Sequence, residues 1–215
     1  PRDGFLTLKL KELDLDISYF NSFKLLTVEY PQGYNLTFDI DKKPVFFKEL
    51  ILPHRTRDHN GEDRLQEIIN KNWINPEQYF NGTAGDSLEV ELPFPQNARH
   101  LDLVIIDPYD ERIILAACGS GPNETMIQCL KSILISIEGI DKTFVLNTRS
   151  IFYPDAIELT PYLPQLKQMG KIKINIYFTA PHKISLIGLN TFKIEEYQIK
   201  EYQLQKAVHN RLKDV

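Results

Sequence analysis

The chain has 215 residues, of which 42% are hydrophobic and 25% charged, and this composition is typical of globular proteins rather than disordered or fibrous ones. Its 25 Lys and Arg against 29 Asp and Glu give a net charge of −4, which argues against a nucleic-acid partner because such binding needs clustered positive charge. The longest apolar runs are far shorter than the roughly 20 residues that cross a bilayer, so we expect no membrane span.

Short alternating segments dominate the chain. Leu6, Leu8 and Leu10 alternate with polar residues, as in a half-buried strand. The runs 101–107 and 112–117 are almost continuously apolar, which indicates strands covered on both faces. Further segments rich in β-branched and aromatic residues predict strands at 23–30, 34–40, 45–50, 87–92, 143–147, 171–179 and 184–189. We therefore predict a mainly β fold, an antiparallel β-sandwich of jelly-roll type in one or more modules.

We expect one or two short helices between the strands. Asn60 is a candidate N-cap and Leu65, Ile68 and Ile69 fall on one helical face, a pattern that predicts a helix near 61–73. Helical spacing also begins at 123, ahead of the apolar strand pattern near 134. The dipeptides Leu-Pro at 163 and Met-Gly at 169 are predicted breaks.

The glycine- and proline-containing segment 119–122 is the best candidate for a boundary. We expect a β-sandwich module over 1–118, and either a second β-rich module or a continuation of the same sandwich over 119–190. His-Asn follows a strand-like segment at position 59 and again at 209, so we expect 191–215 to begin a further strand repeat that is truncated in a piece of a longer protein.

Two cysteines and three glycosylation sequons bear on the compartment. Cys118 and Cys129 have ten residues between them, which favours a local disulfide, with two buried free thiols as the alternative. Candidate glycosylation sites are Asn35, Asn81 and Asn123, each at the start of an N-x-[ST] sequence. Together these features favour an oxidising compartment, so we expect an extracellular or cell-surface protein.

The polar segment 54–63 offers the oxygen ligands that calcium prefers. Its candidate ligands are Asp58, Asn60, Glu62 and Asp63. The segment lacks the glycine that an EF-hand loop places at its sixth position, and a solvated loop with a helix cap explains the same residues. No glycine-rich nucleotide motif is present, so we expect no cofactor apart from this candidate calcium ion.

The acidic residues Asp107, Asp110 and Glu111 lie between two predicted strands. Paired carboxylates in such a place serve general acid and base catalysis in hydrolases, but a hairpin turn explains these residues equally. The sequence has no nucleophile-elbow motif, and we assign no catalytic residue.

Aromatic residues in loops offer a different function. Sugar rings stack on exposed aromatic side chains, and the candidates for such stacking are Trp73, Tyr79, Tyr153 and Tyr162. Large aromatic residues more commonly pack in the core of a sandwich, so core packing is the alternative.

The segments D-A-I-E-L-T-P-Y-L-P at 155–164 and G-K-I-K-I-N-I-Y-F-T-A-P-H-K-I-S-L-I-G-L at 170–189 resemble the closing strands of galactose-binding-domain-like β-sandwiches. The segment F-N-S-F-K-L-L-T-V-E-Y-P at 20–31 resembles β-modules of secreted or cell-surface multidomain proteins. The resemblance implies a binding, adhesion or assembly module, and it supplies no ligand and no site residue because these folds serve many functions.

We therefore expect a non-enzymatic extracellular module that makes structural or protein-protein contacts with other subunits, or with neighbouring modules of its own chain, in a surface or secreted assembly. The strand pattern at 192–204 could be completed by such a neighbour. A carbohydrate-binding module is the first alternative. A hydrolase fragment that uses the acidic residues at 107, 110 and 111 is the second.

The predicted disulfide can be tested by mass. If Cys118 and Cys129 are bridged, the chain purified from an oxidising compartment is lighter by two hydrogens than the same chain after reduction, and it takes up alkylating reagent only after reduction. Equal masses and immediate alkylation of both thiols would contradict the disulfide and remove one of the two arguments for secretion.

Overall fold

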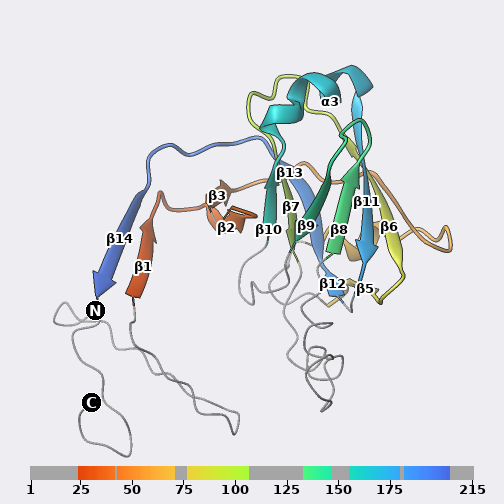
Figure 1. Cartoon of the computed structure of the whole chain (residues 1–215), viewed down its shortest axis with the longest axis horizontal. Coiled ribbons are helices and arrows are strands. Elements are labelled where there is room, and N and C mark those ends of the chain that lie inside the picture. The colour runs from red at the N-terminus through yellow and green to blue at the C-terminus, as the bar shows by residue number, and fades with distance from the viewer. Residues whose placement is uncertain are drawn as a thin grey trace, which may run out of the picture. The chain divides into compact units, whose positions relative to one another are not determined.

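The structure of the chain is a computed structural model that describes residues 24–41, 43–70, 77–106, 133–146, 155–179 and 182–203 (Figure 1). The chain divides into two compact units. The smaller unit combines Pro1–Pro31 with Glu196–Val215, and the larger unit is Gln32–Glu195.

The larger unit contains two five-stranded sheets that share one hydrophobic core. The first sheet has the order β13 (Leu186–Asn190), β7 (Asp102–Ile106), β10 (Asp155–Glu158), β2 (Asn35–Asp39) and β3 (Pro44–Phe47). The second has the order β4 (Arg55–Asp58), β6 (Ser87–Pro93), β11 (Lys171–Phe178), β8 (Ile133–Ile137) and β9 (Thr143–Leu146). A short pair is formed by β5 (Phe80–Gly82) and β12 (His182–Ile184). The predicted mainly β, sandwich-like fold is confirmed.

Side chains point alternately to the two faces of each strand, and those that point between the sheets form the core. In β11 the residues Ile172, Ile174 and Ile176 are fully buried, and the residues between them face outward. Burial of each such side chain contributes about 1.5 to 3 kcal/mol. Strand β11, the longest strand among the described residues, pairs with β6 on one side and β8 on the other and so lies at the centre of the second sheet.

Strand β7 is covered on both faces, as its continuous apolar run predicts. Leu103 and Ile105 face the main core, whereas Val104 and Ile106 belong to a second apolar cluster. That second cluster also contains Val45, Phe47, Ala156 and Leu186. The sheet is not purely antiparallel, because β10 pairs with β7 in the antiparallel sense and with β2 in the parallel sense.

The prediction of a helix near 61–73 is wrong for residues 61–70. In this range the structure has a single 3-10 turn, η2 (Leu65–Glu67), and no α-helix. Ile69 instead forms a β-bridge with Leu186, and the carbonyl of Ile68 accepts the N–H of Ile187 at 2.9 Å. The apolar residues that suggest a helix face are therefore used to pair the chain with the free edge of β13. Residues 71–73 lie outside the described ranges.

A helix occurs where the sequence predicts two breaks. Helix α3 (Leu163–Met169) follows a 3-10 turn, η3 (Thr160–Tyr162), and lies above the ends of the strands in Figure 1. Pro164 stands in its first turn, and Gly170, with φ of 68°, ends it in the left-handed conformation that favours glycine. Within the part of the chain that the structure describes, no helix is long and apolar enough to cross a membrane.

Strand pairing joins regions that the sequence places in separate modules. Strand β11 pairs with β6 from the predicted first module and with β8 from the predicted second, which favours the alternative of one continuous sandwich. Residues 24–31 belong to the smaller unit, whereas β2 to β7 belong to the larger one. The predicted boundary at 119–122, the strands at 6–10 and 112–117 and the helix beginning at 123 lie outside the described residues.

The smaller unit contains a two-stranded antiparallel ribbon of β1 (Lys24–Glu29) and β14 (Gln198–Gln203), the latter shorter than the predicted strand at 192–204. Val28 pairs with Ile199 and Leu26 pairs with Glu201, so these four residues lie on the same face. We call the part of it formed by Leu26, Val28 and Ile199 the apolar face. Leu26 is 61% and Ile199 is 53% exposed. The Nζ of Lys200 contacts the Oε1 of Glu29 at 2.7 Å on the opposite face.

Gly82 lies so close to Phe178 that a Cβ on it would clash with the ring. Gly82→Ala is therefore expected to destabilise the protein by roughly 1 to 3 kcal/mol, because the buried ring has to move. Chemical denaturation measures this. As a control, Gly82→Ala combined with Phe178→Leu should cost less than the sum of the two single changes, and strict additivity would contradict the proposed clash.

Candidate binding pocket

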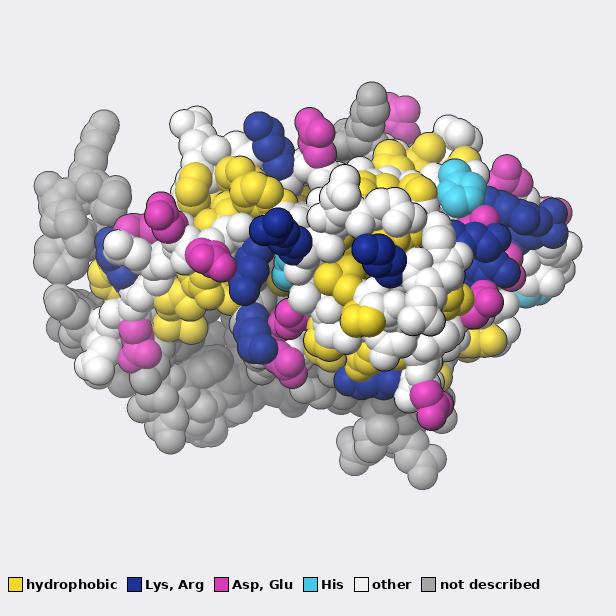
Figure 2. Space-filling view, turned by 90° about the horizontal axis from the view of Figure 1, so that it is seen from above, with side chains coloured by type: hydrophobic (Ala, Val, Ile, Leu, Met, Phe, Trp, Pro, Cys, Tyr) yellow, Lys and Arg dark blue, Asp and Glu magenta, His cyan; other side chains and the backbone are white. Residues whose placement is uncertain are grey.

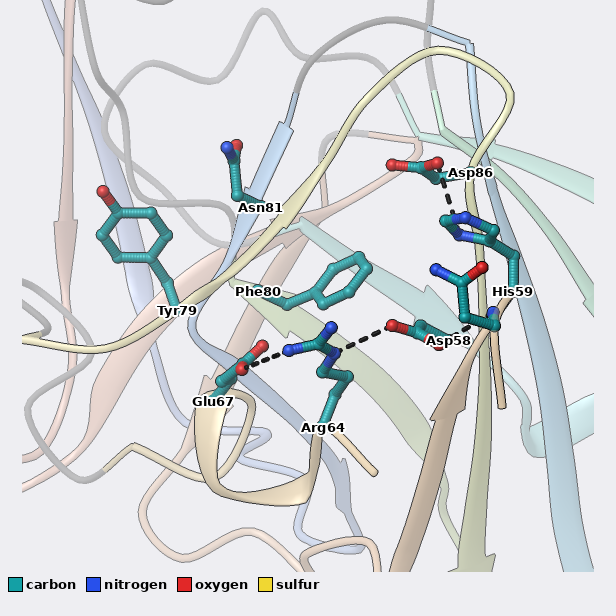
Figure 3. A pocket seen from close by; sticks show the side chains of 9 residues that line it. Asp58, His59, Arg64, Glu67, Tyr79, Phe80, Asn81 and Asp86 are labelled. Carbon is teal, nitrogen blue, oxygen red and sulfur yellow. Dashed lines mark hydrogen bonds and ion pairs between the residues drawn. The ribbon is translucent and has the colours of Figure 1, made fainter. Parts of the chain in front are cut away.

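A pocket of about 270 Å³ opens in the larger unit where β4 and the loop that follows it face β5 (Figure 3). Backbone from three separate parts of the chain meets there. The lining residues are Asp58, His59, Asn60, Arg64, Glu67, Tyr79, Phe80, Asn81 and Asp86. Several of them are hydrogen-bonded or ion-paired to one another, as the dashed lines in Figure 3 show.

The carboxylate of Asp58, at the end of β4, organises this loop. Its side chain is 3% exposed. Its Oδ1 accepts the backbone N–H of Asn60 at 2.9 Å and that of Glu62 at 3.0 Å, and its Oδ2 accepts the Nε of Arg64 at 2.9 Å. Gly61, with φ of 81°, allows the tight turn that brings these donors to one carboxylate.

Arg64 ties the loop together because its guanidinium meets three carboxylates. Its Nε contacts Asp58, its Nη1 contacts Oε1 of Glu67 at 3.2 Å, and its Nη2 contacts Oε2 of Glu62. The backbone N–H of Arg64 is donated to the hydroxyl of the buried Thr56 at 3.1 Å. The guanidinium is therefore already committed to groups of its own chain.

These contacts shift two pKa values. Burial alone would raise the pKa of Asp58, but the hydrogen bond from Arg64 and the backbone N–H groups of Glu62 and Asn60 outweigh it, so the pKa lies below its ordinary value of 3.8. The same hydrogen bond to Asp58 raises the pKa of Arg64. The loop is thus held by an ionised pair.

Asp86 forms the other wall. Its Oδ2 accepts the backbone N–H and the hydroxyl of Thr83, both at 2.8 Å, and its Oδ1 lies 3.3 Å from Nδ1 of His59. The backbone hydrogen bond from Thr83 is the main reason that the pKa of Asp86 is lowered. On the face shown in Figure 2, acidic side chains likewise lie beside basic ones.

A second polar network joins strand ends elsewhere in the sandwich. His100 contacts Oδ2 of the buried Asp102 at 2.7 Å and the hydroxyl of Thr160 at 3.0 Å, in the order carboxylate, imidazole, hydroxyl. The hydroxyl also accepts the N–H of Leu101 at 3.0 Å, and Asn190 donates to Asp102 at 3.0 Å. Because the network links β7, β13 and η3, we assign it to holding these elements together.

The candidate calcium ligands are brought together only in part. Asp58 and Asn60 line the pocket, Glu62 pairs with Arg64, and Oδ1 of Asp63 accepts the N–H of Leu65 at 2.9 Å. Within the described ranges, no group of three or more histidine, cysteine, aspartate and glutamate side chains is placed to hold a metal ion. Internal donors occupy both oxygens of Asp58, Oε2 of Glu62 and Oδ1 of Asp63.

Of the candidate stacking residues, Tyr79 lines the pocket, and the Nζ of Lys183 lies 4.4 Å from its ring centroid. Tyr162 packs edge-on against Phe144, with ring centroids 6.0 Å apart, and contacts the core. Trp73 and Tyr153 lie outside the described residues.

Two candidate glycosylation sites are described. Asn81 is exposed on β5 and Asn35 is half-buried on β2. Several other predicted site residues lie outside the described ranges and stay predictions: Asn123, Cys118, Cys129, Asp107, Asp110 and Glu111.

Arg64, Glu67 and Asp86 are pocket residues that the sequence interpretation missed. For Asp86 a signal exists, because Thr83-x-x-Asp86 has the spacing at which a side chain closes a turn.

Comparisons with protein-family models, with curated proteins and with solved structures found no match. The geometry of the pocket and of the ribbon therefore carries the functional interpretation.

The lowered pKa of Asp58 predicts an acid-sensitive contribution to stability. The ionised carboxylate stabilises the folded state above pH 3.8, and this stabilisation is lost as the pH falls below that value towards the folded-state pKa. Asp58→Asn should therefore lower the urea midpoint of unfolding at pH 7, with the difference from the wild type shrinking below pH 3.8.

Asp41→Asn is the matched control, because the Asp41 side chain is 70% exposed. Its urea midpoint should follow that of the wild type across the same pH series. A difference between Asp58→Asn and the wild type that is independent of pH would show that ionisation of Asp58 does not stabilise the loop.

Proposed function

We propose that the chain is a non-enzymatic β-sandwich module that makes protein-protein contacts in a larger surface or secreted assembly, and that it pairs with a second copy through the apolar face of the β1–β14 ribbon. The observation that carries the proposal is the exposure of Leu26 and Ile199, at 61% and 53%, on a ribbon of two strands. A two-stranded ribbon is marginally stable in water by itself, so covering this face is favourable.

Charge favours contact through the face rather than through the edge of β14. Strand β14 could pair antiparallel with β14 of a second copy, about a two-fold axis perpendicular to the sheet. Opposed side chains then share a face only if one residue of β14 lies directly opposite its own copy. The two registers that pair most of β14 then place Lys200 against Lys200, or Glu201 against Glu201. Like charges directly opposite one another destabilise a sheet.

Stacking of two apolar faces avoids this repulsion. A two-fold axis parallel to the strands places β1 of one copy over β14 of the other, so Val28 lies over Ile199 of the second copy, as their pairing within the ribbon dictates. Val28 and Ile199 thus meet aliphatic side chains, and Leu26 lies over the aliphatic stem of Glu201 of the second copy. Such isologous two-fold contacts are the most common way in which identical chains associate.

The surface or secreted location is supported by different residues. Cys118 and Cys129 have the spacing of a local disulfide, and Asn81 of one sequon is exposed. Contact through the ribbon does not depend on this location.

Sedimentation velocity over a range of concentrations tests the contact. The wild type should form dimers, and Ile199→Asp should weaken the dimer roughly tenfold or more, because the new carboxylate would be buried over Val28 of the second copy and beside Glu201 of its own strand. Val145→Asp, at an apolar residue 47% exposed on β9, should leave the dimer unchanged. A wild type that is monomeric throughout, or equal weakening by both variants, would contradict the proposal.

A further inference from the structure

The pocket beside β4 contains hydrogen-bonding groups that its own chain does not use. Within the described residues, the side-chain amides of Asn60 and Asn81 and the hydroxyl of Tyr79 make no hydrogen bond, although all three line the pocket. Amides and hydroxyls both donate and accept hydrogen bonds. We infer that this pocket binds a single uncharged sugar residue.

The charges of the pocket disfavour an anion. Asp58, Glu67 and Asp86 are three carboxylates, and the one guanidinium among the lining residues, that of Arg64, is already bound by carboxylates. An anionic ligand would meet repulsion from the carboxylates without a guanidinium to compensate it.

The same contacts disfavour a cation. Asp58 accepts three hydrogen bonds, one of them from Arg64, and Asp86 accepts two from Thr83 and lies beside His59. A cation would compete with donors that are already in place. The amides and the hydroxyl that remain available are neutral, and a neutral ligand rich in hydroxyl groups satisfies them, and can donate to Oε2 of Glu67, without breaking an internal contact.

Size and shape restrict the ligand further. A volume of about 270 Å³ lies just below the range of pockets that hold drug-sized molecules, which is about 300 to 1,000 Å³. Figure 3 shows the Phe80 side chain at the centre of the lining residues, with the polar side chains around it. The Phe80 ring is 5% exposed and packs against Phe178 in the core, so it closes the base of the pocket and leaves the polar groups to meet the ligand. A sugar residue offers these groups a rim of hydroxyls.

Saturation-transfer NMR on the full chain tests the inference. The chain is produced in bacteria so that Asn81 carries no glycan, and it is mixed in turn with neutral hexoses, pentoses and N-acetylhexosamines. Glucuronate and methylammonium serve as the charged probes. At least one neutral sugar should receive saturation, and should do so more strongly than either charged probe.

The variants Asn60→Ala, Asn81→Ala and Tyr79→Phe should each weaken binding of that sugar roughly two- to tenfold, the loss expected for one neutral hydrogen bond. They remove exposed or rim groups and keep the loop contacts of Asp58 and Arg64. Asn97→Ala, at an exposed asparagine that does not line the pocket, should bind like the wild type.

Three results would overturn the inference: no neutral sugar of the panel binds, a charged probe binds more tightly than every neutral sugar, or the pocket variants bind like Asn97→Ala. These outcomes are independent of the oligomeric state. Failure of the sugar site therefore leaves contact through the ribbon untouched, and a monomeric chain can still bind sugar.

Discussion

A carboxylate taken out of water has to be met by donors, and Asp58 meets this requirement with two backbone N–H groups and the guanidinium of Arg64. The pocket follows from that arrangement, because the turn at 58–62 and the position of Arg64 are both fixed by the same carboxylate. Arg64 in turn draws in Glu67. The loop is ordered by polar contacts, whereas the sandwich beneath it is ordered by apolar burial.

Alternation predicted most strands of the sandwich, because β8 and β11 bury every second side chain and β6 departs from this pattern only in also burying Glu91. It missed β4, whose residues R-T-R-D carry no apolar side chain, since an edge strand can be held by backbone pairing to β6 alone. Local patterns placed a helix near 61–73, but pairing of Ile69 with the distant Leu186 decided the conformation. The sequence pointed to Asp58, Asn60 and Tyr79. It did not reveal that Asp86 joins them, because that depends on the fold.

The two proposed binding regions use different physical forces. The apolar face of the ribbon has exposed aliphatic groups such as Leu26 and Ile199. Their removal from water favours association of two copies without chemical selectivity, and the two-fold symmetry sets how the copies are oriented. The pocket offers a few neutral hydrogen-bonding groups such as those of Asn60 and Asn81, which favour weak binding with chemical selectivity. A module with both would combine association between subunits with recognition of a small hydroxylated group.

The bridges of Ile51 to Leu189 and of Ile69 to Leu186 fasten both ends of one segment to the same strand, β13, three residues apart. Between these two bridges the chain passes to the second sheet and forms β4, so this segment links the two sheets along one side of the sandwich. Breathing motions that separate the sheets are therefore resisted along this side. The loop that follows β4, which forms one wall of the pocket, is thereby anchored through both ends of its segment to the first sheet.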